Sequence, residues 1–307
     1  MNWLILVAVA VVFDSIRIFI DNYVSDVYFK ERDAVSQKLF YGYGLIISSI
    51  FIVMFTGFDF TALSPYTLCM LLLAGLLSGI AGIPYLKALE IDNSTNLGIF
   101  IQLAPVMYLV LGWLFLGETI STMQLIAIGV ILLAPLFIVT TTRKKSRKVR
   151  LKAVLYAFLY VLIAVIGNLI FVKAASSDLS FINELTILLF GKGVADLLII
   201  YTHPKWRRRF LKVADKSQRK VFSPMVANLA AMLIKEYTYR LALILAPAVT
   251  LASAVSDSAE PIFIFFAGIL LTLIWPKFGR EKLDKKSIIV HLIATVLVVI
   301  GVILIQM

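Results

Sequence analysis

Residues 85–133 read YLKALEIDNSTNLGIFIQLAPVMYLVLGWLFLGETISTMQLIAIGVILL, and this stretch decides the class of fold. It contains most of two apolar runs, 96–117 and 122–141, which only four residues separate. An α-helix rises roughly 1.5 Å per residue, so about 20 apolar residues cross the hydrocarbon core of a bilayer. Each of the two runs is therefore long enough to span a membrane.

The same pattern fills the chain of 307 residues, of which 61% are hydrophobic and 15% are charged. Soluble domains carry about 25% charged residues, and the mean hydropathy here is +0.97. We therefore predict an all-α integral membrane protein with ten transmembrane helices, and we exclude a cytosolic enzyme and a secreted disulfide scaffold. The predicted spans are 2–21, 36–56, 66–88, 96–117, 122–141, 152–173, 182–202, 223–246, 249–274 and 287–306.

Two details of these spans follow from length and charge. A helix over 223–274 would be too long for a bilayer, so the chain is expected to turn at Ala246–Val249. The first span is expected to stay in the mature protein, because no Lys or Arg precedes it and Asp14 and Arg17 interrupt it. The single cysteine, Cys69, permits neither an intrachain disulfide nor a cysteine-based metal site.

The basic residues are concentrated in three loops, 143–152, 203–222 and 276–286, which hold 20 of the 29 Lys and Arg. Each follows an odd-numbered span, whereas the loops after even-numbered spans and both termini contain none. Positively charged loops stay in the cytoplasm. We therefore predict a cell (plasma) membrane protein with these loops inside and both termini outside. The basic loops suit anionic lipid headgroups as partners rather than nucleic acid.

The basic stretch near residue 145 divides the chain into two sets of five spans. We predict one repeat over 1–142, a linker over 143–151 and a second repeat over 152–307. The pentapeptide IGVIL ends both repeats, at 128–132 and at 300–304. A repeat with an odd number of spans must enter the membrane in opposite orientations, which predicts an inverted repeat with the site between its halves.

The segment Tyr85–Leu133 resembles the EamA-type repeat of the drug/metabolite transporter superfamily. The resemblance depends on the Ala-Leu pair at 88–89, on Pro105, on Leu-Gly-Glu at 116–118 and on Gly129. In the second half, Leu273-Ile274-Trp275 stands where Leu-Gly-Glu is expected. The resemblance implies two inverted five-helix bundles that transport small metabolites without ATP hydrolysis, and hence no enzymatic activity and no cofactor. It leaves amino acids, sugars, nucleotide-sugars, lipids and drugs open as substrates.

Charged residues inside the spans are the main candidates for a site, because a charge at a helix centre costs roughly 2.5–3.5 kcal/mol to insert. Asp14, Arg17 and Asp21 share one face of the first span, since they lie at i, i+3 and i+7. Lys192 and Asp196 have i, i+4 spacing, and so do Glu236 and Arg240. The candidate substrate- or ion-binding residues are Asp14, Arg17, Gln102, Asn168, Lys192, Asp196, Asn228, Lys235, Glu236, Arg240, Asp257 and Glu260.

Two interpretations of these charges are open: ion pairs that only hold the bundle together, or groups that bind a polar substrate or a coupling proton. The second through fifth spans carry charges only near their ends, at Lys38, Lys87 and Glu118. Such asymmetry between two halves favours a functional role. The small residues around Gly75 and Gly79 are expected to serve helix packing instead.

We therefore predict a secondary transporter that moves a small polar or zwitterionic metabolite, or a drug, by alternating access. A proton is the coupling ion that we consider. The alternatives are a flippase for a lipid or a lipid-linked headgroup, and a polytopic membrane protein that transports nothing. No loop exceeds about 20 residues, which is too short for a catalytic domain. We expect no metal and no catalytic residue, and either a monomer or a homodimer.

Overall fold

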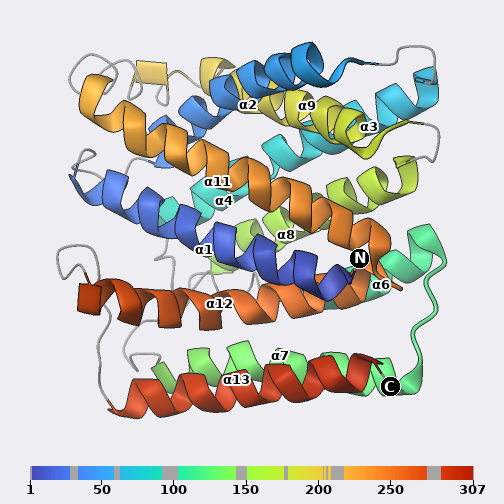
Figure 1. Ribbon diagram of the computed structural model, residues 1–307, viewed down its shortest axis with the longest axis vertical. Coiled ribbons are helices and arrows are strands. Elements are labelled where there is room, and N and C mark those ends of the chain that lie inside the picture. Colours follow the sequence, from blue (N-terminus) through green and yellow to red (C-terminus); the bar gives the residue numbers. More distant parts are fainter. Residues whose placement is uncertain are drawn as a thin grey trace.

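The computed structural model is all-α wherever it describes the chain (Figure 1). The described residues are 2–27, 34–58, 63–91, 103–142, 151–175, 179–202, 204, 207–208, 218–274 and 285–306. Gln102 and most of the three basic loops lie outside these ranges. The helices are α1 (Trp3–Val27), α2 (Ala34–Thr56), α3 (Pro65–Ile80), α4 (Gly82–Ile91), α6 (Ala104–Leu116), α7 (Thr122–Thr142), α8 (Leu151–Ala174), α9 (Phe181–Thr202), α11 (Gln218–Leu245), α12 (Val249–Ile274) and α13 (Lys285–Gln306).

The predicted spans agree with these helices at most boundaries, because length and apolar character are local properties of the sequence. The turn between the eighth and ninth spans is confirmed, since α11 ends at Leu245 and α12 begins at Val249. By length and composition, six of the described helices are suited to cross a membrane, and three further apolar helices are shorter. The structure thus supports an integral membrane protein, while ten crossings and the inverted repeat stay predictions.

The predicted span 66–88 agrees with an apolar stretch, Pro65–Ala88, that is long enough to cross a membrane, and a break in the helical hydrogen bonds at Ala81 divides this stretch into α3 and α4. Pro84 explains the interruption: it has no N–H to donate and its ring crowds the carbonyl of Ile80. Pro105 has a different effect, because it lies in the first turn of α6, where no intrahelical donor is needed. Pro105 therefore starts the described helix and does not bend it.

The helices lie side by side with their axes roughly along one direction, and both chain ends lie at the same side of the bundle (Figure 1). α11, α12 and α13 alternate in direction, so the end of α12 and the start of α13 lie at the opposite side. A chain that crosses a membrane an even number of times has both of its ends at the same side. Many outward side chains are large and apolar, such as Met54, Phe55 and Trp113, as expected of a surface that faces lipid.

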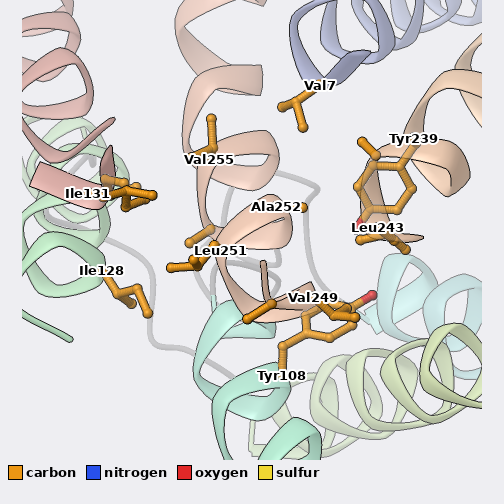
Figure 2. Packing of buried hydrophobic residues seen from close by; sticks show 14 of the residues in the cluster. Val7, Tyr108, Ile128, Ile131, Tyr239, Leu243, Val249, Leu251, Ala252 and Val255 are labelled. Atoms are coloured by element: carbon orange, nitrogen blue, oxygen red, sulfur yellow. The ribbon is translucent and has the colours of Figure 1, made fainter. Parts of the chain in front are cut away.

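The core joins residues from both halves of the sequence. Figure 2 shows Val249, Leu251, Ala252 and Val255 of α12 among side chains from α1, α6, α7 and α11. A second cluster of buried residues includes Leu71 of α3, Phe171 of α8 and Leu188 of α9. The two halves are therefore interleaved, and charged residues from distant segments can meet inside the bundle.

Glycines bring α9 close to α2 and α3. A Cβ added at Gly75 would lie 2.9 Å from the backbone nitrogen of Lys192, and one added at Gly79 would lie 2.9 Å from its carbonyl oxygen. On the other side, a Cβ at Gly193 would lie 2.9 Å from the carbonyl oxygen of Gly42. These contacts agree with the packing role predicted for Gly75 and Gly79, and they fix the segment of α9 that carries Lys192 and Asp196.

Candidate functional site

The acid–base–acid set of α1 forms as its spacing predicts. Arg17 Nε donates to Asp14 Oδ1 at 2.6 Å, and Arg17 Nη1 donates to Asp21 Oδ2 at 3.1 Å. One helix thus supplies two carboxylates that hold one guanidinium, which is why the set could be recognised from sequence.

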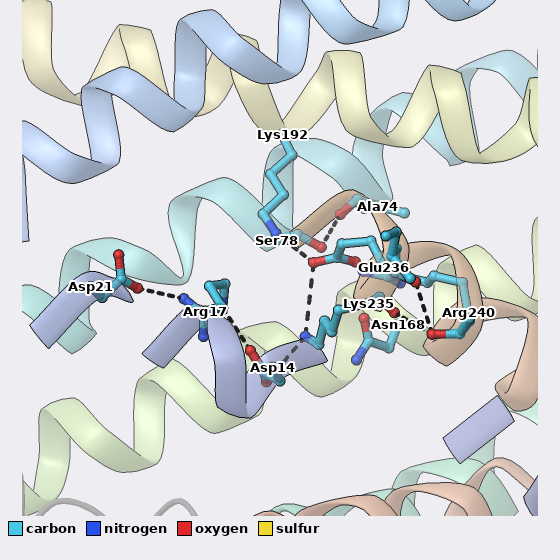
Figure 3. A network of polar contacts seen from close by, with 12 residues as sticks. Asp14, Arg17, Asp21, Ala74, Ser78, Asn168, Lys192, Lys235, Glu236 and Arg240 are labelled. Carbon is cyan, nitrogen blue, oxygen red and sulfur yellow. Dashed lines mark hydrogen bonds and ion pairs between the residues drawn. The ribbon is translucent and has the colours of Figure 1, made fainter. Parts of the chain in front are cut away.

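Lys235 of α11 connects this set to further charges. Its Nζ lies 3.8 Å from Asp14 Oδ2 and 4.0 Å from Glu236 Oε1. Glu236 in turn accepts from Lys192 Nζ at 2.7 Å and from Arg240 Nε at 3.3 Å. Figure 3 shows this continuous chain of contacts, which runs from Asp21 on α1 to Arg240 on α11 and reaches α9 through Lys192.

The i, i+4 spacing of Lys192 and Asp196 does not produce an ion pair between them. Lys192 binds Glu236 of α11, whereas Asp196 Oδ1 lies 2.5 Å from Lys38 Nζ of α2. Each of the two side chains pairs with a residue of the helix that it faces, which is α11 for Lys192 and α2 for Asp196. Lys38, which the sequence placed merely near a helix end, is therefore the ion-pair partner of a buried carboxylate.

The amide candidates bind side chains from other helices. Asn228 Nδ2 donates to Asp21 Oδ1 at 2.6 Å and also to the hydroxyl of Tyr41. Tyr41 in turn donates to Asp21. Asn168 donates to the hydroxyl of Tyr108 and thus lies in a separate polar contact between α8 and α6. Nothing in the sequence singled out Tyr41 or Tyr108, since tyrosines are frequent in apolar spans.

The two carboxylates of α12 have few partners. Asp257 accepts from Ser253 Oγ at 3.1 Å. Within the described residues, Glu260 has no hydrogen bond and no ion pair, although it interacts electrostatically with Asp14, Arg17 and Lys235. Pro261 follows directly inside α12 and cannot donate to the carbonyl of Asp257. Both carboxylates therefore lie beside an interruption of the helical hydrogen bonds.

Exposure divides the charged set into two groups. The side chains of Glu236 and Arg240 are almost fully buried, and the guanidinium of Arg240 lies 5.0 Å from the centre of the Phe171 ring. By contrast, the side chains of Arg17 and Lys235 are 28% and 24% exposed. Arg17 and Lys235 therefore keep exposed surface, whereas Glu236 and Arg240 are enclosed by neighbouring side chains.

Glu118 has a role that the sequence did not reveal. Gly117, with a φ of 68°, ends α6 in the left-handed region. Glu118 then accepts from the backbone N–H of Val249 at 2.6 Å and from Thr250 Oγ1 at 3.0 Å. The Leu-Gly-Glu motif thus caps the first turn of α12 from the other half of the chain.

Three further predictions concern Gln102, metal binding and Lys87. Gln102 lies outside the described residues. Among the residues that the structure describes, no group of three or more His, Cys, Asp or Glu could hold a metal ion. Lys87 lies 5.7 Å from the centre of the Tyr156 ring, away from the charged set.

Comparison with known proteins bears on the first half most directly. Residues 2–141 match the EamA-like transporter family, a domain of the drug/metabolite transporter superfamily. This match confirms the resemblance seen over 85–133. No curated protein matches the chain.

Among solved structures, 28 chains match the fold. One of them, described only as a protein crystal structure, has a TM-score of 0.65 and 14% sequence identity. The alignment covers 97% of this chain and 96% of that one. The likeness therefore concerns the fold alone, but it extends over both halves.

Proposed function

We propose that this chain, in which residues 2–141 match the EamA-like transporter family, is a secondary transporter that moves a small zwitterionic metabolite by alternating access. The transported molecule binds between α1, α11 and α12. The basic loops face the cytoplasm, and a proton is the coupling ion.

The observation that supports this proposal most is a pair of incompletely satisfied charges. Lys235 Nζ has carboxylate oxygens no nearer than 3.8 Å, and it makes no hydrogen bond to any described residue. Glu260 likewise lacks a partner in the described part of the chain, yet the two side chains interact electrostatically. Charged groups within membrane-spanning segments normally pair with one another or face a water-filled cavity. A ligand with an anionic group for Lys235 and a cationic group for Glu260 would satisfy both.

Arg17 adds a second donor to the anionic end of this site. Asp14 and Asp21 bind its Nε and Nη1, and a guanidinium has five N–H donors in a planar fork. The remaining donors are therefore held in a fixed orientation, which suits a carboxylate or a phosphate-like anion.

Asp257 and Glu260 supply the proposed proton site. An intramembrane carboxyl group that faces a binding site is a common proton carrier in transporters. Protonation of Glu260 would neutralise its charge and release the cationic end of the substrate. Binding of substrate and of a proton would thus exclude each other at this carboxylate, which is a simple basis for exchange.

The test is uptake of a metabolite panel into proteoliposomes, with and without a proton gradient. Zwitterions should be transported faster than neutral or singly charged analogues of the same size. Lys235→Gln and Glu260→Gln should each reduce uptake at least tenfold, because each removes one charge that the ligand needs.

Lys87→Gln is the matched control, since it removes a lysine that lies over Tyr156, and it should retain uptake. Normal uptake by both site variants would refute the site. Translocation of lipid headgroups without uptake of any metabolite would refute the substrate class in favour of a flippase.

A further inference from the structure

Lys38 occupies a position in the bundle that is separate from the proposed substrate site. Its ammonium lies 2.5 Å from Asp196 Oδ1 and donates to the carbonyl oxygen of Gly79 at 3.1 Å. The Asp196 side chain is 3% exposed and that of Lys38 is 16% exposed. Three segments of the chain therefore meet at one charge: α2 supplies the lysine, α9 the carboxylate and α3 the carbonyl.

The carbonyl belongs to the end of an interrupted helix. Gly79 lies in the last turn of α3, which ends at Ile80, and α4 begins at Gly82. The carbonyls in the last turn of a helix carry a partial negative charge, and the Gly79 carbonyl accepts a backbone N–H in addition to the bond from Lys38. In transporters, such half-helix ends together with a carboxylate commonly coordinate a monovalent cation.

Gly82, which has no side chain, leaves space for the end of Lys38. A Cβ added at Gly82 would lie 2.6 Å from Lys38 Cε, so a larger residue would displace the end of the lysine. The other nearby cation is Lys192, one turn earlier on α9, and it is bound to Glu236 at 2.7 Å. Among the described residues, Lys38 is thus the cation that pairs with Asp196.

We propose that the Lys38 ammonium is a tethered cation that fills a monovalent-cation position formed by Asp196 and the end of α3. The native protein therefore needs neither sodium nor potassium at this position. Removal of the amine leaves a carboxylate and a helix-end carbonyl that bind an inorganic monovalent cation instead. This inference is independent of the proposed substrate site, because it concerns different residues and a different helix interruption.

The experiment compares the melting temperature of purified Lys38→Ala in the chlorides of sodium, potassium and N-methyl-D-glucamine at equal ionic strength. Sodium or potassium should raise its melting temperature by roughly 2–4 °C over the bulky organic cation, because a ligand that binds only the folded state stabilises it. The native protein should show no such difference.

Two control variants separate a specific site from a general salt effect. Lys38→Ala combined with Asp196→Asn should lose the cation response, because the carboxylate ligand is absent. Lys87→Ala should behave as the native protein does. These measurements need no transport assay. The cation inference can therefore hold when the uptake experiment contradicts the proposed function, and the proposed function can hold when the cation inference fails.

Two results would overturn the inference. One is a folded Lys38→Ala protein whose melting temperature is the same in all three salts, which would mean that Lys192 or water takes over. The other is failure of Lys38→Ala to fold in any of the three salts, since a bound cation should replace the missing charge.

Discussion

At the scale of single residues, burial decides which charges support the site and which are free to bind. Glu236 accepts hydrogen bonds from Lys192 and Arg240 and is almost fully buried. Lys235 is more exposed and makes only long contacts to Asp14 and Glu236. We therefore expect Glu236 to contribute mainly to stability, although the sequence made it as strong a candidate for the binding site as Lys235.

Glu236→Gln tests this division of roles. The substitution removes the charge that Lys192 and Arg240 share and leaves two buried cations with a neutral partner. Breaking a buried pair in this way typically costs about 3–5 kcal/mol, so the melting temperature should fall clearly. Lys235→Gln should instead lower uptake while it changes the melting temperature little. Equal melting of both variants, measured on purified protein, would contradict the assignment.

At the scale of helices, close backbone contacts place the charges. Gly75 and Gly79 of α3 face the backbone of α9 around Lys192, and Gly193 faces α2. With α9 held between α2 and α3, Asp196 reaches Lys38 while Lys192 reaches Glu236. A small-residue stripe that looks like ordinary packing thus determines which charges meet.

Two glycine variants test this arrangement. At Gly75, an added methyl would contact the backbone of Lys192 and Gly191 at 2.9 and 3.0 Å, so Gly75→Ala should force α3 away from α9. We expect a loss of about 1–3 kcal/mol. At Gly129, nothing lies within 4 Å of the added Cβ, so Gly129→Ala should melt at or above the native temperature. A stable Gly75→Ala protein would show that the helix contact is not rigid.

At the scale of the whole molecule, the direction of the helices agrees with the distribution of charge along the sequence. Both chain ends lie at one side of the bundle, and the end of α12 and the start of α13, which flank the basic stretch 276–286 in the sequence, lie at the other (Figure 1). A cytoplasmic position for the basic loops would therefore put both termini outside.

Cysteine labelling tests this orientation in intact cells. After Cys69 is replaced by Ser, a single cysteine at Ser146 or Ser217, in the two most basic loops, should resist a reagent that does not cross the membrane. A single cysteine at Asn2, near the N-terminus, should react. Disruption of the cells should make all three reactive. Ready labelling at 146 and 217 before disruption would reverse the proposed topology.

The sequence by itself determined the membrane class, most helix boundaries, the turn after Leu245 and the intrahelical contacts of Arg17 and Arg240. Each depends on residues within about one to six helical turns, so apolar length and i, i+3 or i+4 spacing are enough to find it. The interruption at Ala81 was missed, although Pro84 was a local sign of it.

Only the tertiary structure decided the partners of Lys192 and Asp196, the burial of Lys38 against Asp196 and the cap that Glu118 provides for α12. These contacts join segments between 44 and 158 residues apart, as Lys192 with Glu236 and Lys38 with Asp196 show. A side chain on a helix faces whichever neighbour the packing presents, and spacing along one helix does not identify that neighbour. In this protein, the close approach of α9 to α2 and α3 determines which neighbours Lys192 and Asp196 face.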